Sequence, residues 1–325
     1  MNTILVVTQP YIGMSIDINM ELISKANELS EDNHATVLVL VMEGVLKETL
    51  QAYSRYGGDE FLICEVETQK DFIYYSNIVV QVCKEFQPDL VMYPGTDLGK
   101  AISATVAVDL GAALVADCID IQVLENGEYC FTRAAMNSCI IAQIRCMKDC
   151  IQMCTIKKNT FPLKELVKEK QIVIHNIPLL QDETGEVTVR TIQSTIEDAA
   201  QKSRIEDANV IFGVGRGVLP QDIPLVEQIA KYYKAEVGCS RYYVEEKVMD
   251  KSQQIGQSGN CVRPDIYIAL GISGASQHMV GLKNAKKIIA INNDENAAIM
   301  KYADYIVIAN THETIHAMYS KMLGE

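Results

Sequence analysis

Short apolar runs alternate with helical stretches through the second half of the chain, and each run ends in glycine or a small polar residue. The clearest example is Tyr267–Leu270, which leads directly into Gly271–Gly274. This alternation is typical of parallel strands joined by helical crossovers. Because the carboxyl ends of such strands lie at one edge of the sheet, the turns after them gather where α/β proteins bind ligands. The pattern therefore restricts this half to a parallel α/β architecture.

The turns carry donors and positive charge suited to an electron-rich ligand. Ser273 and Gly274 stand where the pattern predicts the start of a helix, so free backbone N–H groups and the helix dipole would face a ligand there. Arg241 adds a fixed positive charge. Further donors and acceptors come from Gln257, Ser258, Gln277 and His278. We expect a large, flat cofactor with many polar atoms.

Four blocks in this region, in this order and spacing, resemble the FAD-binding domain of the alpha subunit of electron-transfer flavoproteins. The blocks are Ser240–Arg241, Gln254–Gly259, Gly271–His278 and Ala290–Asp294. A lone glycine motif would say little, whereas four blocks spread over about fifty residues are specific. The resemblance implies that the cofactor is FAD.

The resemblance also implies roles for individual residues. Arg241 would lie over the flavin ring and His278 would hydrogen-bond its pyrimidine edge, so that both tune the flavin. Arg216 matches an arginine that the family places against the cofactor, and Ser258 stands near the flavin N5 position. The expected FAD-binding residues are Arg216, Ser240, Arg241, Gln254, Ile255, Gly256, Gln257, Ser258, Ser273, Gly274, Ala275, Ser276, Gln277, His278, Asn292, Asn310 and Thr311.

By this resemblance the chain is the alpha subunit of a heterodimeric electron carrier. It would bind FAD, pair with a beta subunit, and pass electrons between dehydrogenases, such as acyl-CoA dehydrogenases, and a downstream acceptor. Electron bifurcation is an option that the resemblance leaves open. The flavin does the redox chemistry, so we expect an electron carrier, not a substrate-converting enzyme. The sequence accordingly shows no Ser-His-Asp or paired-carboxylate constellation.

The sequence raises two other functions. A flavin-free nucleotide-binding scaffold is the main alternative, because Asn310 replaces an expected aspartate and Lys247–Val248 replaces a glycine and an aromatic residue. A stand-alone nicotinamide-dependent oxidoreductase is disfavoured. The glycines of Gly213–Gly217 follow a strand, but the last of them comes one position too early for the G-x-G-x-x-G fingerprint.

The fold expected is α/β with two domains. Residues 1–195 would form an N-terminal parallel-sheet domain with a small antiparallel addition, which packs with the beta subunit. Residues 196–325 would form a doubly wound FAD-binding domain, and the polar stretch Gln181–Arg204 would be the hinge between them. The first half resembles the family through Tyr93–Lys100, Leu114–Cys118 and Thr132–Ala134. It departs where Lys100 replaces an arginine and where Thr155–Asn159 replaces a Val-Arg-Pro-Gly turn.

The strand and helix patterns give the following elements. Strands are expected at 3–8, 35–41, 60–64, 89–93, 208–214, 235–238, 266–270, 287–291 and 305–309. Helices are expected at 18–29, 45–53, 71–86, 100–110, 223–233, 277–282, 296–302 and 312–323. An antiparallel group is expected at 119–123, 129–133, 139–146 and 150–156.

Composition excludes several classes of partner. The chain has 325 residues, 48% of them hydrophobic, which is enough for two cores. Its 29 basic and 42 acidic residues give a net charge of −13, which argues against binding to nucleic acid and to anionic membranes. Met1–Thr8 lacks the basic start of a signal peptide, and no apolar run is long enough for membrane insertion. We expect a cytoplasmic protein.

Two patterns raise the question of a metal site. Cys139, Cys146, Cys150 and Cys154 lie close in sequence but lack the C-x2-C spacing of zinc and iron–sulfur sites. His312–His316 spells H-E-x-x-H, which on a helix puts both histidines on one face with Glu313 as a possible base. Only nine residues follow His316, so a third ligand would have to come from elsewhere. We expect no metal, and a C-terminal helix that carries the histidines by chance.

Overall fold

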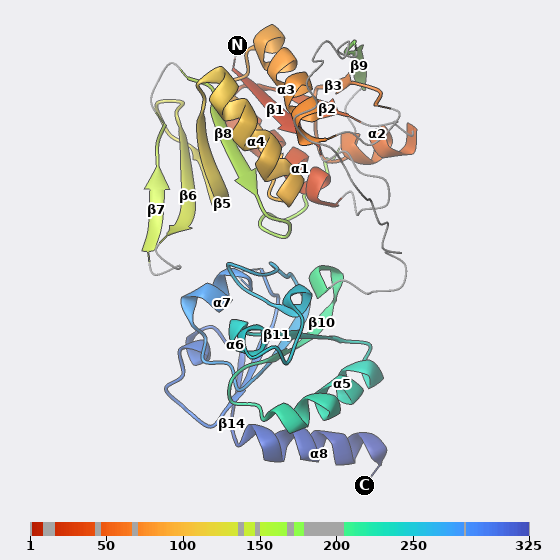
Figure 1. Ribbon diagram of the computed structural model, residues 1–325, viewed down its shortest axis with the longest axis vertical. Coiled ribbons are helices and arrows are strands. Elements are labelled where there is room, and N and C mark those ends of the chain that lie inside the picture. Colours follow the sequence, from red (N-terminus) through yellow and green to blue (C-terminus); the bar gives the residue numbers. More distant parts are fainter. Residues whose placement is uncertain are drawn as a thin grey trace. The chain divides into compact units, whose positions relative to one another are not determined.

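The computed structural model contains two compact units (Figure 1). The structure describes residues 2–8, 17–42, 47–66, 71–135, 140–146, 150–167, 172–178, 205–282 and 284–324. Apart from Ala135 and Ile140, the first unit holds the described residues of 2–178, and the second holds those of 205–324. Both are built on a mostly parallel sheet with helices, which confirms the predicted two-domain α/β class. The predicted boundary at 195/196 and the predicted hinge lie outside the described residues.

A nine-stranded sheet forms the centre of the first unit, in the order β7-β6-β5-β8-β4-β1-β2-β3-β9. Its strands are β1 (Thr3–Val7), β2 (Thr36–Val41), β3 (Glu60–Ile63), β4 (Leu90–Pro94), β5 (Ala113–Val123), β6 (Tyr129–Ala135), β7 (Ile140–Ile144), β8 (Gln152–Ile156) and β9 (Val173–Asn176). Strands β1, β2, β3, β4, β8 and β9 are joined by parallel pairing, and β5 pairs antiparallel with β6.

Strand β8 corrects the sequence prediction for the antiparallel group. It was expected among the antiparallel strands, but it pairs parallel with β4 and with the first part of β5. Burial explains this position, because Met153–Ile156 are buried as expected for a strand covered on both faces. Strand β5 also begins at Ala113, six residues before the predicted start at Ile119, and β9 was not predicted.

Alternate residues of the central strands supply two hydrophobic cores, one on each face of the sheet. Ile4 and Val6 face helices α1 (Asp17–Asn33) and α2 (Lys47–Ser54). Leu5 and Val7 face helices α3 (Phe72–Phe86) and α4 (Asp97–Leu110). The near-continuous apolar strands of this half follow from burial on both faces.

The second unit is a doubly wound domain with a five-stranded sheet in the order β11-β10-β12-β13-β14. All of its strand pairs are parallel, as predicted. The chain runs from β10 to β11 on one side and then crosses to β12 on the other, so the order reverses between β10 and β12. The strands are β10 (Val210–Val214), β11 (Glu236–Cys239), β12 (Ile266–Leu270), β13 (Ile288–Asn292) and β14 (Tyr305–Ile308).

Helices cover both faces of this second sheet. On one face α5 (Ile223–Tyr232) and α8 (Thr311–Leu323) lie side by side (Figure 1) and pack on Phe212 and Val214. On the other face the short helix α7 (Ser276–Val280) and the 3-10 turn η4 (Ala298–Lys301) pack on Ile211 and Tyr267. A further short helix, α6 (Arg241–Glu245), was not predicted.

Among the residues that the structure describes, no helix is both long enough and apolar enough to cross a membrane.

Candidate functional site

The predicted cofactor residues follow the carboxyl ends of the five strands in the second unit. In the register of the sheet, Val214 lies beside both Cys239 and Leu270, and Leu270 lies beside Ile291. The strands therefore end at the same level, and the turns after them meet at one edge. This edge includes the point where the strand order reverses, which is the usual ligand position in open α/β sheets.

Glycines close the turns after β10 and β12 onto each other. The Gly215 N–H donates to the Leu270 carbonyl at 2.8 Å, and the Gly217 N–H donates to the Gly271 carbonyl at 3.1 Å. Gly274 has φ 80°, and a Cβ there would lie 2.2 Å from the backbone N of Ile299. Only glycine fits that position without moving the neighbouring backbone.

The loop at 254–260 packs against the turn at 275–281. The Gln257 N–H donates to the Gln277 carbonyl at 2.8 Å, and the Ile255 N–H donates to the Cys239 carbonyl at 2.9 Å. The Gln254 side chain donates from Nε2 to the Ser258 Oγ at 2.8 Å. Gln254, Ile255 and Gly256 are buried, so they form the scaffold of the loop, while Ser258 is exposed.

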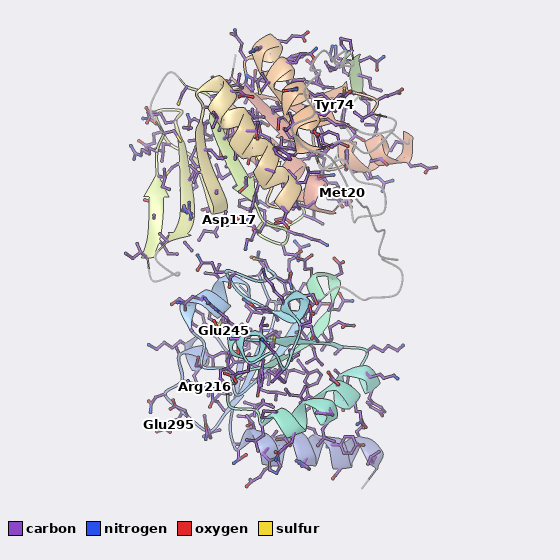
Figure 2. All side chains as sticks on the ribbon, in the orientation of Figure 1. Met20, Tyr74, Asp117, Arg216, Glu245 and Glu295 are labelled. Atoms are coloured by element: carbon purple, nitrogen blue, oxygen red, sulfur yellow. The ribbon has the colours of Figure 1, made fainter. Side chains whose placement is uncertain are left out.

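Several exposed side chains that can donate hydrogen bonds lie along this edge of the sheet. Arg216 follows β10, and among the described residues it has no ion-pair or hydrogen-bond partner. Arg241 begins α6, is 70% exposed, and its Nε lies 2.7 Å from Glu245 Oε1 one turn later; Figure 2 labels both Arg216 and Glu245. The other exposed or half-exposed residues of the predicted set are Ser240, Gln257, Ser258, Ser273, Ala275, Ser276, Gln277 and Asn310.

The helix after β12 is shorter than the sequence predicted. Helix α7 begins at Ser276 and has five residues, so Ser273 and Gly274 belong to the preceding turn. A macrodipole needs several aligned turns. Any anion bound here would therefore be held by individual N–H groups and hydroxyls more than by a helix dipole.

His278 is buried beneath this edge. Its Nε2 shares a 2.9 Å hydrogen bond with the Tyr267 hydroxyl, a partner that the sequence did not indicate. Burial lowers the pKa of His278 to about 4. The neighbouring backbone of Ile255 raises this pKa, but by less than burial lowers it. The imidazole is therefore neutral near pH 7. Among the described residues its Nδ1 has no hydrogen-bond partner, which leaves one buried polar atom unsatisfied.

Side-chain hydrogen bonds stabilise the turns at this edge, and they come from Asn292, Asn310 and Thr311. The Asn292 Nδ2 donates to the Ile272 carbonyl at 3.0 Å, and the Thr311 Oγ1 donates to the Gly217 carbonyl at 2.6 Å. Asn310 is the N-cap of α8, because its Oδ1 accepts from the His312 N–H at 2.9 Å. These hydrogen bonds stabilise the fold of the edge itself.

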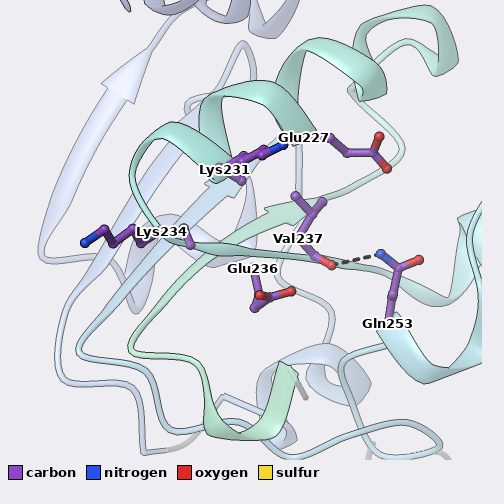
Figure 3. Close-up of a pocket in the computed structure, with 8 residues that line it drawn as sticks. Glu227, Lys231, Lys234, Glu236, Val237 and Gln253 are labelled. Carbon is purple, nitrogen blue, oxygen red and sulfur yellow. Dashed lines mark hydrogen bonds between the residues drawn. The ribbon is translucent and has the colours of Figure 1, made fainter. Parts of the chain in front are cut away.

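A pocket of about 500 Å³ in this unit lies away from these turns. It is formed by the end of α5 and the start of β11, and Figure 3 shows Lys231, Lys234 and Glu236 around it. None of the predicted cofactor residues lines it. Its position at the amino end of β11 makes it a poor candidate for the ligand site of a parallel sheet.

The edge has the features that an extended anionic dinucleotide requires. Two exposed arginines supply positive charge in a chain of net charge −13. Glycine turns let backbone approach the ligand, exposed hydroxyls and amides can donate to phosphate and ring atoms, and His278 Nδ1 is unpaired among the described residues. FAD has a pyrophosphate and a polar ring edge, so these residues fit it. The fold and the site define a dinucleotide-binding α/β domain.

Comparison with known families identifies that domain. The family model described as "Electron transfer flavoprotein FAD-binding domain" matches residues 204–283, and the one described as "Electron transfer flavoprotein domain" matches residues 4–207. The chain belongs to the electron transfer flavoprotein alpha-subunit family, and its cofactor is FAD. This confirms the resemblance found in the sequence and favours a flavin-dependent electron carrier over the flavin-free scaffold.

Relatives match along almost the whole chain. The electron transfer flavoprotein subunit alpha of Bacillus subtilis is 31% identical over 302 residues, covering 92% of this chain and 90% of the relative. That of Thermoanaerobacterium thermosaccharolyticum is 26% identical over 316 residues, covering 95% and 94%. The lactate dehydrogenase (NAD(+),ferredoxin) subunit LctC of Acetobacterium woodii is 29% identical over 320 residues, covering 96% of this chain and 75% of the relative.

The sequence analysis missed one further group. Asp222, at the turn before α5, lies against His312 and His316 of α8, from which it is separated by 90 and 94 residues. No local pattern marks Asp222, because it is the last residue of an ordinary proline turn, Pro220–Asp222. Contacts between residues so far apart follow from the packing of α5 on α8.

Proposed function

We propose that this chain pairs with an electron transfer flavoprotein beta subunit and that its second unit holds the FAD through the residues predicted from the sequence. The observation that carries this proposal is the gathering of those residues at one edge of the second sheet, where the strand order reverses. Family membership supports both the cofactor and a partner subunit.

The proposed residue roles follow from exposure and charge. Arg216 and Arg241 are exposed cations that would face the pyrophosphate and the flavin ring, respectively. Ser258, Ser273 and Ser276 would donate hydrogen bonds from exposed hydroxyls. The neutral His278 would use its Nδ1 atom toward the ring edge. The bound FAD supplies the redox chemistry, and these side chains set its position and the charge around it.

The proposed partners are a dehydrogenase, of which acyl-CoA dehydrogenases are the class first expected, and a downstream electron acceptor. The name of the Acetobacterium woodii relative supports a dehydrogenase, since that protein is a subunit of one. We further propose that the domain boundary lies at 195/196, that the first domain packs with the beta subunit, and that the second swings about the stretch at 181–204.

We propose the cytoplasm as the location. The described cysteines are all free, and most of them are buried. Unpaired thiols in such number are typical of a reducing compartment.

The test is co-expression with the beta subunit, purification of the complex, and measurement of FAD per heterodimer by its absorbance after release. We expect at least one FAD per heterodimer in the wild type. The variants Arg216→Ala and Ser273→Ala should bind FAD more weakly and therefore lose it after less dilution of the complex than the wild type. The control is Lys231→Ala, which removes an exposed charge beside the pocket of Figure 3 and should retain FAD as the wild type does. Equal FAD retention in all variants would contradict the proposed residues, and failure to co-purify would contradict the proposed partner.

A further inference from the structure

Asp222, His312 and His316 form a compact cluster on the face of the second unit where α5 packs on α8. The His312 Nδ1 lies 2.8 Å from Asp222 Oδ2, and the His316 Nε2 lies 3.4 Å from Asp222 Oδ1. The two imidazole rings are 4.4 Å apart between centroids. One potential ligand atom from each residue lies within 4.8 Å of the other two.

The elements hold the three side chains in different ways. His312 and His316 are four residues apart, so the first turns of α8 place them on one face. Asn310 caps this helix and Thr311 bonds Gly217, which fixes the start of α8. Asp222 is the residue just before α5, and its side chain is 2% exposed. The carboxylate is therefore fixed, while the imidazoles, 44% and 51% exposed, can turn.

We propose that Asp222, His312 and His316 bind a divalent transition-metal ion of the zinc class. Two imidazole nitrogens and one carboxylate oxygen are a common donor set for such ions, whereas calcium and magnesium prefer oxygen ligands throughout. Zinc bonds of about 2.0–2.2 Å put tetrahedral ligands roughly 3.3 Å apart. Small rotations of the two half-exposed rings would bring all three atoms to that spacing.

The surroundings of the cluster indicate what such an ion would do. The protein supplies three ligands, and the half exposure of both histidines leaves the fourth position to water. The ligands come from two segments that are about ninety residues apart, so the ion would fasten the C-terminal helix to the start of α5. Glu313, the second residue of the H-E-x-x-H pattern, is exposed and has no role in this proposal.

A simpler explanation is that the two histidines only satisfy the buried carboxylate. The two explanations differ in what zinc does to the protein. An ion that binds the folded state alone raises the temperature of unfolding, in proportion to the logarithm of its concentration above Kd. Histidines that serve only as hydrogen-bond donors give no such response.

The experiment uses the purified FAD-loaded complex with the beta subunit, freed of metal by a chelator and titrated with Zn²⁺ by calorimetry. The variants are His312→Gln and His316→Gln, whose side chains are exposed enough to change without loss of the fold. The control is His175→Gln, since His175 is also half-exposed and paired with a single carboxylate, Glu60, at 2.8 Å. Flavin absorbance checks that each variant remains folded.

The expected result is one Zn²⁺ bound by the wild type and by His175→Gln, with affinity at least tenfold weaker in His312→Gln and His316→Gln. Zinc should raise the unfolding temperature of the wild type and not that of His316→Gln. Binding that is unchanged in both variants would assign the ion to another group, such as the thiols, and would overturn the proposal. So would the absence of any Zn²⁺ binding to the wild type.

Discussion

Arg241 shows how one residue can set a property of the whole cofactor site. Its guanidinium is exposed and paired with Glu245 at 2.7 Å, so the field that reaches a neighbouring flavin comes from a pair of opposite charges. The sequence indicated only the cation. The structure adds an anion that opposes it, which gives the proposal two tests of opposite sign.

We predict that Arg241→Ala lowers the reduction potential of the bound flavin, because removal of a cation destabilises the reduced, more negatively charged form. A unit charge about 4 Å away at an effective dielectric of about 20 is worth roughly 4 kcal/mol, and after screening a shift on the order of 0.1 V remains. Glu245→Gln should shift the potential upward. Spectroelectrochemical titration of the complex measures both changes.

The control for this prediction is Lys231→Ala, which removes the same net charge near the amino end of β11. It should leave the potential unchanged within a few hundredths of a volt, since distant exposed charges are screened. Equal potentials in the wild type and Arg241→Ala would remove Arg241 from the proposed flavin contact.

A second prediction for a single residue concerns His278 and the dependence of the protein's stability on pH. Burial lowers its pKa from 6.5 to about 4, so between these values the unfolded chain binds a proton that the folded chain does not. Its contribution to stability is therefore present above pH 6.5 and is lost as the pH falls toward 4. The loss is on the order of 3 kcal/mol.

Urea unfolding of the wild type and of His278→Gln at pH 7.0, 5.5 and 4.5 tests this. The free energy of unfolding should fall more steeply with decreasing pH in the wild type than in the variant. His34→Asn changes an exposed histidine with φ 55°, a conformation that asparagine tolerates, and should keep the wild-type slope. Parallel slopes for the wild type and His278→Gln would show that His278 titrates normally in the folded chain.

At the scale of elements, the start of α8 joins the cofactor edge to the helical face of the second unit. Thr311 is buried, and its Oγ1 donates to the Gly217 carbonyl at 2.6 Å, in the turn that follows β10. Thr311→Val keeps the shape but leaves that carbonyl unpaired, so we predict a loss of about 1 kcal/mol in the free energy of unfolding.

Thr311→Ser retains the hydroxyl and serves as the matched variant. It should recover most of the stability lost in Thr311→Val, as measured by urea unfolding. FAD should also dissociate faster from Thr311→Val than from Thr311→Ser, because Gly217 adjoins Arg216. If both variants unfold alike, the hydrogen bond does not stabilise the fold, and the loss arises from packing.

Local patterns predicted most elements of the fold, and long-range contacts account for what they missed. Apolar runs followed by glycine turns were enough to predict β10, β12 and the turns of the candidate site. Strand β8 was assigned to the wrong pairing, because its sequence does not show that it inserts between β4 and β5. Tyr267 and Asp222 were not recognised as partners of histidines, since their contacts depend on how distant elements pack.

At the scale of the whole molecule, two units with separate cores are joined through residues 179–204, whose conformation lies outside the described part of the chain. The sequence there is polar and weakly periodic, which is typical of a connection between domains. Family models divide the chain in the same region, at residues 204 and 207. A cofactor bound by the second unit should then remain with it when the connection is cut.

We therefore predict that brief trypsin digestion of the FAD-loaded complex cuts this chain first at Arg190, Lys202 or Arg204, because segments that join compact domains are cleaved before their interiors. Mass spectrometry identifies the cut, and chromatography under native conditions, followed by flavin absorbance, shows which fragment holds FAD. The C-terminal fragment should carry it. First cleavage within residues 71–135 or 205–282 would contradict the proposed boundary, and flavin on the N-terminal fragment would contradict the proposed site.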